Sequence, residues 1–142
     1  MSRPEQVRIG LPRDASAPSG GRDAVRSLLG AHVPLSFMSD AVLVTSELVT
    51  NALIHAHGAL EVLAQFDRQR GLLRVEVCDS SSDVPRPRKP VPNQVGGVGL
   101  RVVAAVSSAW GCAFNESGKT VWFELTSDSA VRPRSSSAPT TA

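Results

Sequence analysis

The sequence predicts an α/β fold of the α+β type, a two-layer sandwich in which helices cover one face of a mostly antiparallel, mixed sheet. Two observations carry this prediction. Two pairs of short, strand-like segments are each joined by a polar turn, which is the signature of a β-hairpin. The predicted order is strand, two helices, hairpin, long loop, helix and hairpin, and this order gathers the helices on one side. With 142 residues, the chain suffices for one domain.

The first strand and the first helix are short. Residues 6–12, QVRIGLP, alternate apolar and polar side chains and so predict a strand that ends at Pro12. The next segment predicts a turn followed by a helix over roughly residues 21–30, and Gly30 is expected to stop that helix.

A long helix comes next and contains most of the candidate site. We expect it to run from about Leu35 or Asp40 to His57, with Gly58 as its C-terminal cap. The segment is apolar on most sides, which indicates that the helix is buried.

The second half of the chain is predicted as two hairpins around a loop and a helix. The loop has four prolines and no hydrophobic periodicity, so it is neither a helix nor an inner strand. The glycine-rich helix after it is expected to close at Gly111. In order, the segments are the hairpin 59–79, the loop 80–97, the helix 98–111 and the hairpin 112–126.

The chain therefore divides into a folded domain, residues 1–126, and a Ser-, Pro- and Thr-rich tail, residues 127–142, that is expected to be disordered. The net charge of +2 is too small to indicate nucleic-acid binding. The sequence has no apolar run of about 20 residues and no signal-peptide core, so we expect a cytoplasmic protein without a membrane span. Cys78 and Cys112 are expected to be free, small apolar residues.

Three polar side chains interrupt the long apolar helix at four-residue intervals: Glu47, Asn51 and His55. Such spacing places them in one stripe on the helix. Burying a carboxylate, an amide and an imidazole among aliphatic neighbours is costly unless each finds a partner. The stripe therefore predicts a polar group that faces it.

Further features agree with a nucleotide as that group: Asp79, the glycine-rich segment 96–100, and Thr120 in the strand GKTVWFEL. Asp79 ends an apolar strand and could accept a hydrogen bond from an exocyclic amine such as that of adenine. The glycine-rich segment 96–100 leads into a helix, where free N–H groups favour a phosphate. Asn51 beside a carboxylate suits Mg²⁺, which takes its other ligands from water and phosphates. Each feature alone is weak: such a stripe is more often a solvated helix edge, such a glycine-rich segment is more often a plain helix start, and Asp79 could begin a turn. Only their joint order and spacing predict a site for a nucleoside triphosphate and a metal.

The four segments that carry these features resemble one family. SELVTNALIHA, VEVCDSSSDVP, GGVGLRVVAAVSSAWG and GKTVWFEL, in this order, are similar to the single-domain anti-sigma-factor serine/threonine kinases. That family lies within the superfamily of gyrase, histidine-kinase and chaperone ATPases (GHKL). The resemblance covers roughly residues 5–126 and implies the GHKL fold.

The resemblance also implies roles for particular residues, with ATP and Mg²⁺ as cofactors. Glu47 would be the general base and Asn51 the Mg²⁺ ligand. His55 follows the asparagine as in the family, either near the phosphates or in a structural hydrogen bond. The nucleotide-binding residues implied by the resemblance are Asn51, His55, Asp79, Gly97, Gly99, Leu100 and Thr120, with Asp79 and Thr120 at the adenine.

The activity implied by the resemblance is that of an anti-sigma factor, which sequesters a sigma factor. It also phosphorylates a serine or threonine of an anti-anti-sigma antagonist of the STAS type, and such proteins tend to form homodimers. One alternative is a nucleotide-binding partner-switch module without phosphoryl transfer, and a weaker one is an interaction domain that has lost ATP. The superfamily pattern D-x-G-x-G departs here at Ser81 and Asp83, which weakens the case for kinase activity.

Overall fold

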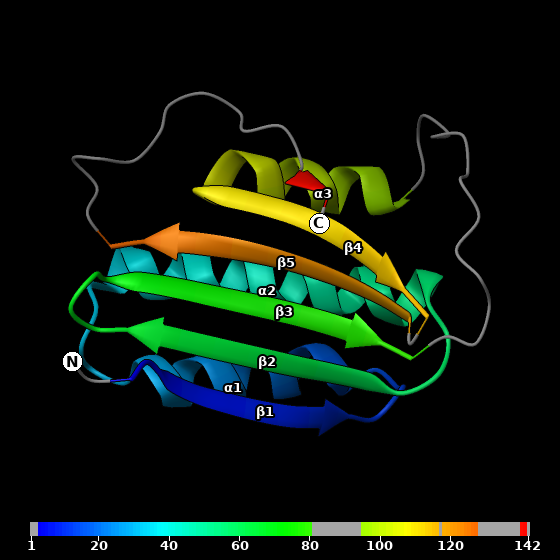
Figure 1. The fold of residues 1–142 in the computed structure, drawn as a ribbon, viewed down its shortest axis with the longest axis horizontal. Helices are drawn as coiled ribbons and strands as arrows, with labels where there is room; N and C mark the ends of the chain where they lie inside the picture. The colour runs from blue at the N-terminus through cyan, green and yellow to red at the C-terminus, as the bar shows by residue number, and fades with distance from the viewer. Residues whose placement is uncertain (1–2, 81–94, 117, 128–139, 142) are drawn as a thin grey trace.

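The computed structural model of the chain describes residues 3–80, 95–116, 118–127 and 140–141, and it confirms the predicted fold class (Figure 1). A six-stranded sheet has the order β1-β2-β3-β5-β4-β6 and is antiparallel except where β6 pairs with β4. All three helices lie on one face of this sheet. The elements are β1 (Glu5–Leu11), α1 (Ala17–Leu29), α2 (Leu35–His55), β2 (Leu60–Asp67), β3 (Leu72–Asp79), α3 (Val95–Val106), β4 (Ala109–Asn115), β5 (Gly118–Thr126) and β6 (Thr140–Thr141).

The core lies between the helices and the covered face of the sheet. Strands β2 and β3 alternate strictly between buried and half-buried residues, as expected where one face of a sheet packs on helices. Val62, Val75 and Phe123 supply fully buried side chains from three neighbouring strands, and Val44 and Leu48 of α2 pack into the same cluster. The hydrophobic effect on this face therefore fixes which side of each strand points toward the helices.

Helix α1 starts earlier than predicted. It begins at Ala17 rather than near residue 21, with a proline in its first turn, where the missing N–H costs no hydrogen bond. Gly30 ends the helix as predicted, with φ at 55°. Gly20, which was predicted to lie before the helix, is inside it together with Gly21, and both glycines let α1 approach its neighbours closely.

The predicted end of α2 is wrong by two residues. The helix stops at His55, and Ala56 caps it in an extended conformation. Gly58 lies in the turn that follows, with φ at 80°, and does not cap the helix. By length and composition α2 could cross a membrane, but seven of its residues are buried in the core of the domain.

The boundary between α3 and β4 also differs from the prediction. The helix ends at Val106, so that Gly111 lies inside β4 and closes no helix. The N–H of Ser108 donates to the carbonyl oxygen of Glu124 at 2.8 Å, and Trp110 pairs with Phe123 on the covered face. Pairing with β5 and burial of the Trp110 indole thus extend β4 toward the end of α3.

Two predicted segments are described only in part. The long loop was predicted over residues 80–97, and its positions 81–94 lie outside the described residues. Of the segment predicted to be a disordered tail, Ser127 is described and Thr140–Thr141 form β6 beside β4. Its remaining positions lie outside the described part of the chain.

Candidate functional site

The segments that carry the candidate residues meet at one end of the sheet, which we call the site end. There α2 and β3 finish, and β5 and α3 begin, at the right of Figure 1. The registers place this end securely, because Asp79 of β3 pairs with Leu60 of β2 on one side and with Lys119 of β5 on the other. Segments far apart in the sequence are therefore adjacent here.

Arg13 holds the last turn of α2 in place. Its guanidinium donates hydrogen bonds to the carbonyl oxygens of Ala52 at 3.1 Å, Leu53 at 3.0 Å and Gly58 at 3.3 Å, and also to that of Ala56. The last carbonyls of a helix have no partner within the helix, and the end carries partial negative charge, so a cation is favourable there. Sequence analysis missed Arg13, since no local pattern connects it to a helix about 40 residues away.

Backbone and side-chain hydrogen bonds join the end of β3 to the turn after α2. Ser80 donates its N–H to the carbonyl oxygen of Ala59 at 2.9 Å, and its hydroxyl oxygen accepts from the N–H of Ala59 at 2.8 Å. The turn also needs Gly58, because a Cβ there would come within 2.8 Å of the carbonyl oxygen of Ser80. These contacts set the position of Asp79 relative to the end of α2.

The polar stripe of α2 points away from α1. Thr45 and Val49 face α1, where they would contact a Cβ placed on Gly21. Residues two apart lie about 200° apart around a helix, so Glu47 and Asn51 lie on the side of α2 opposite α1. Figure 1 shows that α3 lies on that side of α2, against which it packs. Both side chains are half-buried, and neither makes a hydrogen bond or ion pair to the described part of the chain.

His55 belongs to the same stripe but differs in its surroundings. It is the last residue of α2, and its side chain is exposed. A positive or hydrogen-bonding imidazole at this point lies beside the negative end of the helix. Its predicted role at the phosphates stays a prediction.

Asp79 is buried, with 6% of its surface exposed, and shares the covered face of the sheet with Val75 and Val77. The backbone of Gly118 passes close to it. With φ at 139°, a Cβ on Gly118 would collide with the carbonyl oxygen of Asp79. A glycine is thus required there, and the strand end that presents Asp79 is closely packed.

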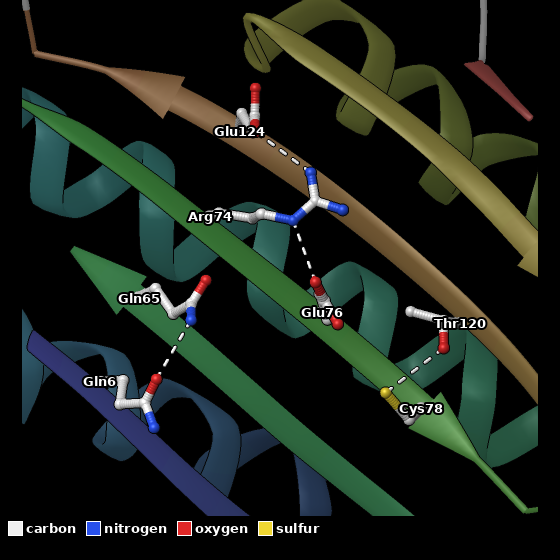
Figure 2. Close-up of polar contacts among 7 residues, drawn as sticks. All are labelled: Gln6, Gln65, Arg74, Glu76, Cys78, Thr120 and Glu124. Carbon is white, nitrogen blue, oxygen red and sulfur yellow. Dashed lines mark hydrogen bonds and ion pairs between the residues drawn. The ribbon is translucent and has the colours of Figure 1, made fainter. Parts of the chain in front are cut away.

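Thr120 and Lys119 lie on opposite faces of β5. Thr120 pairs with Cys78, and its hydroxyl donates to the Cys78 sulfur at 3.4 Å on the helix-free face (Figure 2). Lys119 pairs with Asp79, and paired residues share a face, so Lys119 is the β5 side chain next to the Asp79 carboxylate. The structure does not bring Thr120 to Asp79, and its role at the adenine stays a prediction. Strand alternation could have given this result from the sequence. Val121 and Phe123 are apolar and predict the covered face, which places Lys119 on that face and Thr120 on the other.

The glycines predicted to bind phosphate fall within α3. The helix starts at Val95, so Gly97, Gly99 and Leu100 lie in its first two turns, and no acidic residue is present in the first turn. The first N–H groups of a helix have no partner within it, which favours an anion. Because α3 packs against α2, these groups lie on the side of α2 that carries Glu47 and Asn51.

Both cysteines are free thiols, as predicted. Burial raises the pKa of the Cys112 thiol, while Lys119 lowers it and Asp79 raises it to a smaller extent. Burial likewise raises the pKa of Cys78, against the hydrogen bond from Thr120. Neither thiol is therefore a ready nucleophile at neutral pH.

The donor set at the site end fits a nucleotide. The buried carboxylate of Asp79 accepts hydrogen bonds, and the start of α3, which has no acidic residue in its first turn, favours an anion. The half-buried amide of Asn51 and carboxylate of Glu47 face the same side of α2. Within the described ranges, no group of three His, Cys, Asp or Glu side chains could hold a metal ion. A Mg²⁺ ion that is bound through one protein ligand and phosphates does not require such a group.

Comparison with known proteins agrees with this geometry. The family model for the histidine kinase-like ATPase domain matches residues 12–125. Among solved structures, the crystal structure of the RsbU and RsbW domains of Rv1364c from Mycobacterium tuberculosis is similar to this chain, with a TM-score of 0.64 and 22% sequence identity. The similarity covers 86% of this chain and 32% of that one, so this chain matches only about a third of its length. No curated protein sequence matched the chain.

Proposed function

This chain belongs to the family of histidine kinase-like ATPase domains, and from that premise we propose that it is an ATP-binding anti-sigma-factor kinase. Membership of this family implies that the nucleotide is ATP. In the proposal, the protein sequesters a sigma factor and phosphorylates a serine or threonine of an anti-anti-sigma protein of the STAS type. We also propose that it works in the cytoplasm, as a possible homodimer.

One observation supports the proposal most: Asp79, the polar side of α2 and the glycine-rich start of α3 converge at one end of the sheet. The fold is also similar to a structure that contains an RsbW domain. The two ends of a nucleotide need different chemistry, and the site end offers both. A carboxylate is available for the base, and helix N–H groups are available for the phosphates.

Each residue then has a physical task. Asp79 accepts a hydrogen bond from the adenine amine, which orients the base. The N–H groups near Gly97 and Gly99 hold the phosphates, and Asn51 would hold Mg²⁺, which neutralises charge on the phosphates. Glu47 accepts the proton of the attacking serine or threonine hydroxyl while the hydroxyl oxygen forms a bond to the γ-phosphorus of ATP. The bond between that phosphorus and the bridging oxygen breaks, and ADP leaves.

A transfer assay tests the kinase. The protein is incubated with labelled ATP, Mg²⁺ and candidate anti-anti-sigma proteins, and the same assay is run with Glu47→Ala. We expect the label on the antagonist with the native protein and a loss of at least about a hundredfold in rate with the variant, as for a general base. Transfer that survives the substitution would contradict the role of Glu47.

The second candidate function is a partner-switch module that binds nucleotide without transfer. The observation that favours it is the sequence after Asp79, which has Ser81 and Asp83 at the two glycine positions of the superfamily pattern. Stable ATP binding without transfer to any antagonist would support this function over the kinase.

Asn51→Ala tests the metal ligand. We expect the variant to melt near the native temperature without nucleotide, because Asn51 makes no hydrogen bond to the described part of the chain. Mg²⁺-dependent stabilisation by ATP should be lost, since binding energy appears as a rise in Tm. An apo variant that unfolds at a much lower temperature would instead show a structural role for Asn51.

A further inference from the structure

The position next to the base-binding carboxylate carries a lysine. Asp79 and Lys119 are direct partners in the antiparallel register of β3 and β5, so their Cβ atoms are about 4.5–5.5 Å apart on the covered face. Lys119 is half-buried, and its side chain makes no ion pair or hydrogen bond to the described part of the chain. The side chains of Lys119 and the buried Asp79 thus start side by side on the covered face at the site end.

A second observation agrees with the placement of both charges near the covered face. Burial raises the pKa of the Cys112 thiol most. Lys119 lowers this pKa, and Asp79 raises it to a smaller extent. Cys112 pairs with Val121 on the covered face, two residues along β5 from Lys119. Thr120, between them, is turned to the other face, where its hydroxyl contacts Cys78 (Figure 2).

The two groups together match one edge of adenine. That edge has an amine donor at N6 and, next to it, an acceptor at N1. A carboxylate only accepts hydrogen bonds, and an ammonium only donates them. Guanine presents the reverse order at the same two positions, an acceptor at O6 and a donor at N1. A carboxylate beside an ammonium therefore selects adenine and disfavours guanine on both atoms.

We propose that Lys119 is a specificity-determining residue, whose ammonium donates a hydrogen bond to N1 of the adenine that Asp79 holds by its N6 amine. This inference rests on the proposed binding of ATP at the site end. It assigns to Lys119 the base contact that sequence analysis expected from Thr120.

The test compares ATP with 1-deaza-ATP, which has a carbon in place of N1, on the native protein and on Lys119→Met. Native protein should bind 1-deaza-ATP about tenfold more weakly than ATP, since a hydrogen bond from a charged donor is lost. Lys119→Met should bind ATP about tenfold more weakly and should no longer distinguish the two. Lys119→Arg, which keeps a donor, should retain the discrimination.

Two controls accompany the titrations. Arg70→Met removes one positive charge from the exposed turn between β2 and β3, at the far end of the sheet, and should leave both affinities unchanged. The analogue 7-deaza-ATP keeps N1 and should bind like ATP to every variant. Melting curves without nucleotide show whether each variant is folded.

The outcomes separate the inference from the proposed function. If Lys119→Met weakens the binding of ATP and the binding of 1-deaza-ATP by the same factor, the ammonium contacts a phosphate or acts through general charge. The inference about N1 then fails, while the proposed binding of ATP stands. Unchanged ATP affinity in Lys119→Met overturns it as well. If the folded native protein binds neither nucleotide, the proposed function itself fails.

Discussion

The two faces of the sheet carry similar polar residues in different arrangements. On the helix-free face, Arg74 donates to Glu76 at 3.0 Å and to Glu124 at 3.1 Å (Figure 2). Its guanidinium lies 4.2 Å from the centre of the Trp122 ring. Both carboxylates thus have the Arg74 guanidinium as a partner within the protein. On the covered face, Asp79 and Lys119 lie at the last register position of the β3–β5 pair, next to the ends of two helices.

The difference separates charges that pair within the protein from charges that we propose to meet a ligand. The network around Arg74 is complete within the protein, so it needs no ligand, although partly exposed ion pairs of this kind contribute little stability. The half-buried Glu47 and Asn51 make no hydrogen bond to the described residues, and such groups are costly unless a ligand or water meets them. The covered face at the site end is therefore where the account places the nucleotide.

The largest effect is expected from Gly118→Ala. The new methyl group would collide with the backbone of Asp79, and φ at 139° is strained for alanine, so the free energy of unfolding should fall by about 3 kcal/mol or more. Urea denaturation measures the loss. The matched control is Gly10→Ala in β1, where a Cβ would meet nothing within 4 Å, and it should change stability little.

An equal effect at both glycines would contradict the close packing of the site end. Because Gly118 adjoins Asp79, the proposed base-binding residue, whatever fraction of Gly118→Ala stays folded should also bind ATP more weakly than native protein does. Gly10→Ala should bind it normally.

A smaller effect is expected from Arg13→Ala. Loss of the guanidinium leaves carbonyl oxygens at the end of α2 without their donor, so the free energy of unfolding should fall by about 1–2 kcal/mol. Arg26→Ala is the control, since its exposed pair with Asp23 at 3.4 Å contributes about 0.5 kcal/mol or less. If both variants lose the same stability in urea, Arg13 does not hold α2 as described.

The smallest effect concerns the two thiols, one on each face. Lys119 lowers the pKa of Cys112, against the larger effect of burial, and has no such effect recorded on Cys78. Lys119→Met should therefore raise the pKa of Cys112 further and reduce its thiolate fraction at pH 8 to 9. Alkylation of Cys112 should slow a few-fold at most, while Cys78 keeps its rate.

Mass spectrometry after timed iodoacetamide treatment at several pH values separates the two cysteines. No nucleotide is needed, so the experiment tests the position of Lys119 independently of function. Equal slowing at both thiols would place the lysine elsewhere.

Much of the fold could be predicted because its determinants are local. Alternation and polar turns predicted both hairpins, and the breaks at Pro12 and Gly30 ended the first strand and helix as expected. The boundary at Gly111 failed because pairing with β5, which is a long-range contact, outweighs the local preference for helix. Local sequence carries no information about such a partner.

The site was partly predictable for the same reason. The stripe of Glu47 and Asn51 follows from helical spacing, and Asp79 from its place at a strand end. The faces of Lys119 and Thr120 depend on strand register, where a shift of one residue exchanges the two sides. Arg13 acts across about 40 residues of sequence, so only the folded chain shows its contacts.

The most direct measurement is a titration of isotope-labelled protein with Mg²⁺ and ATP, followed by the backbone amide signals. The account predicts that the signals of Asn51, Asp79, Gly118 and Lys119 move together with one dissociation constant, while those of Arg74 and Glu124 stay in place. Movement centred on Arg74 and Glu124, or no movement at the site end at saturating ATP, would contradict it.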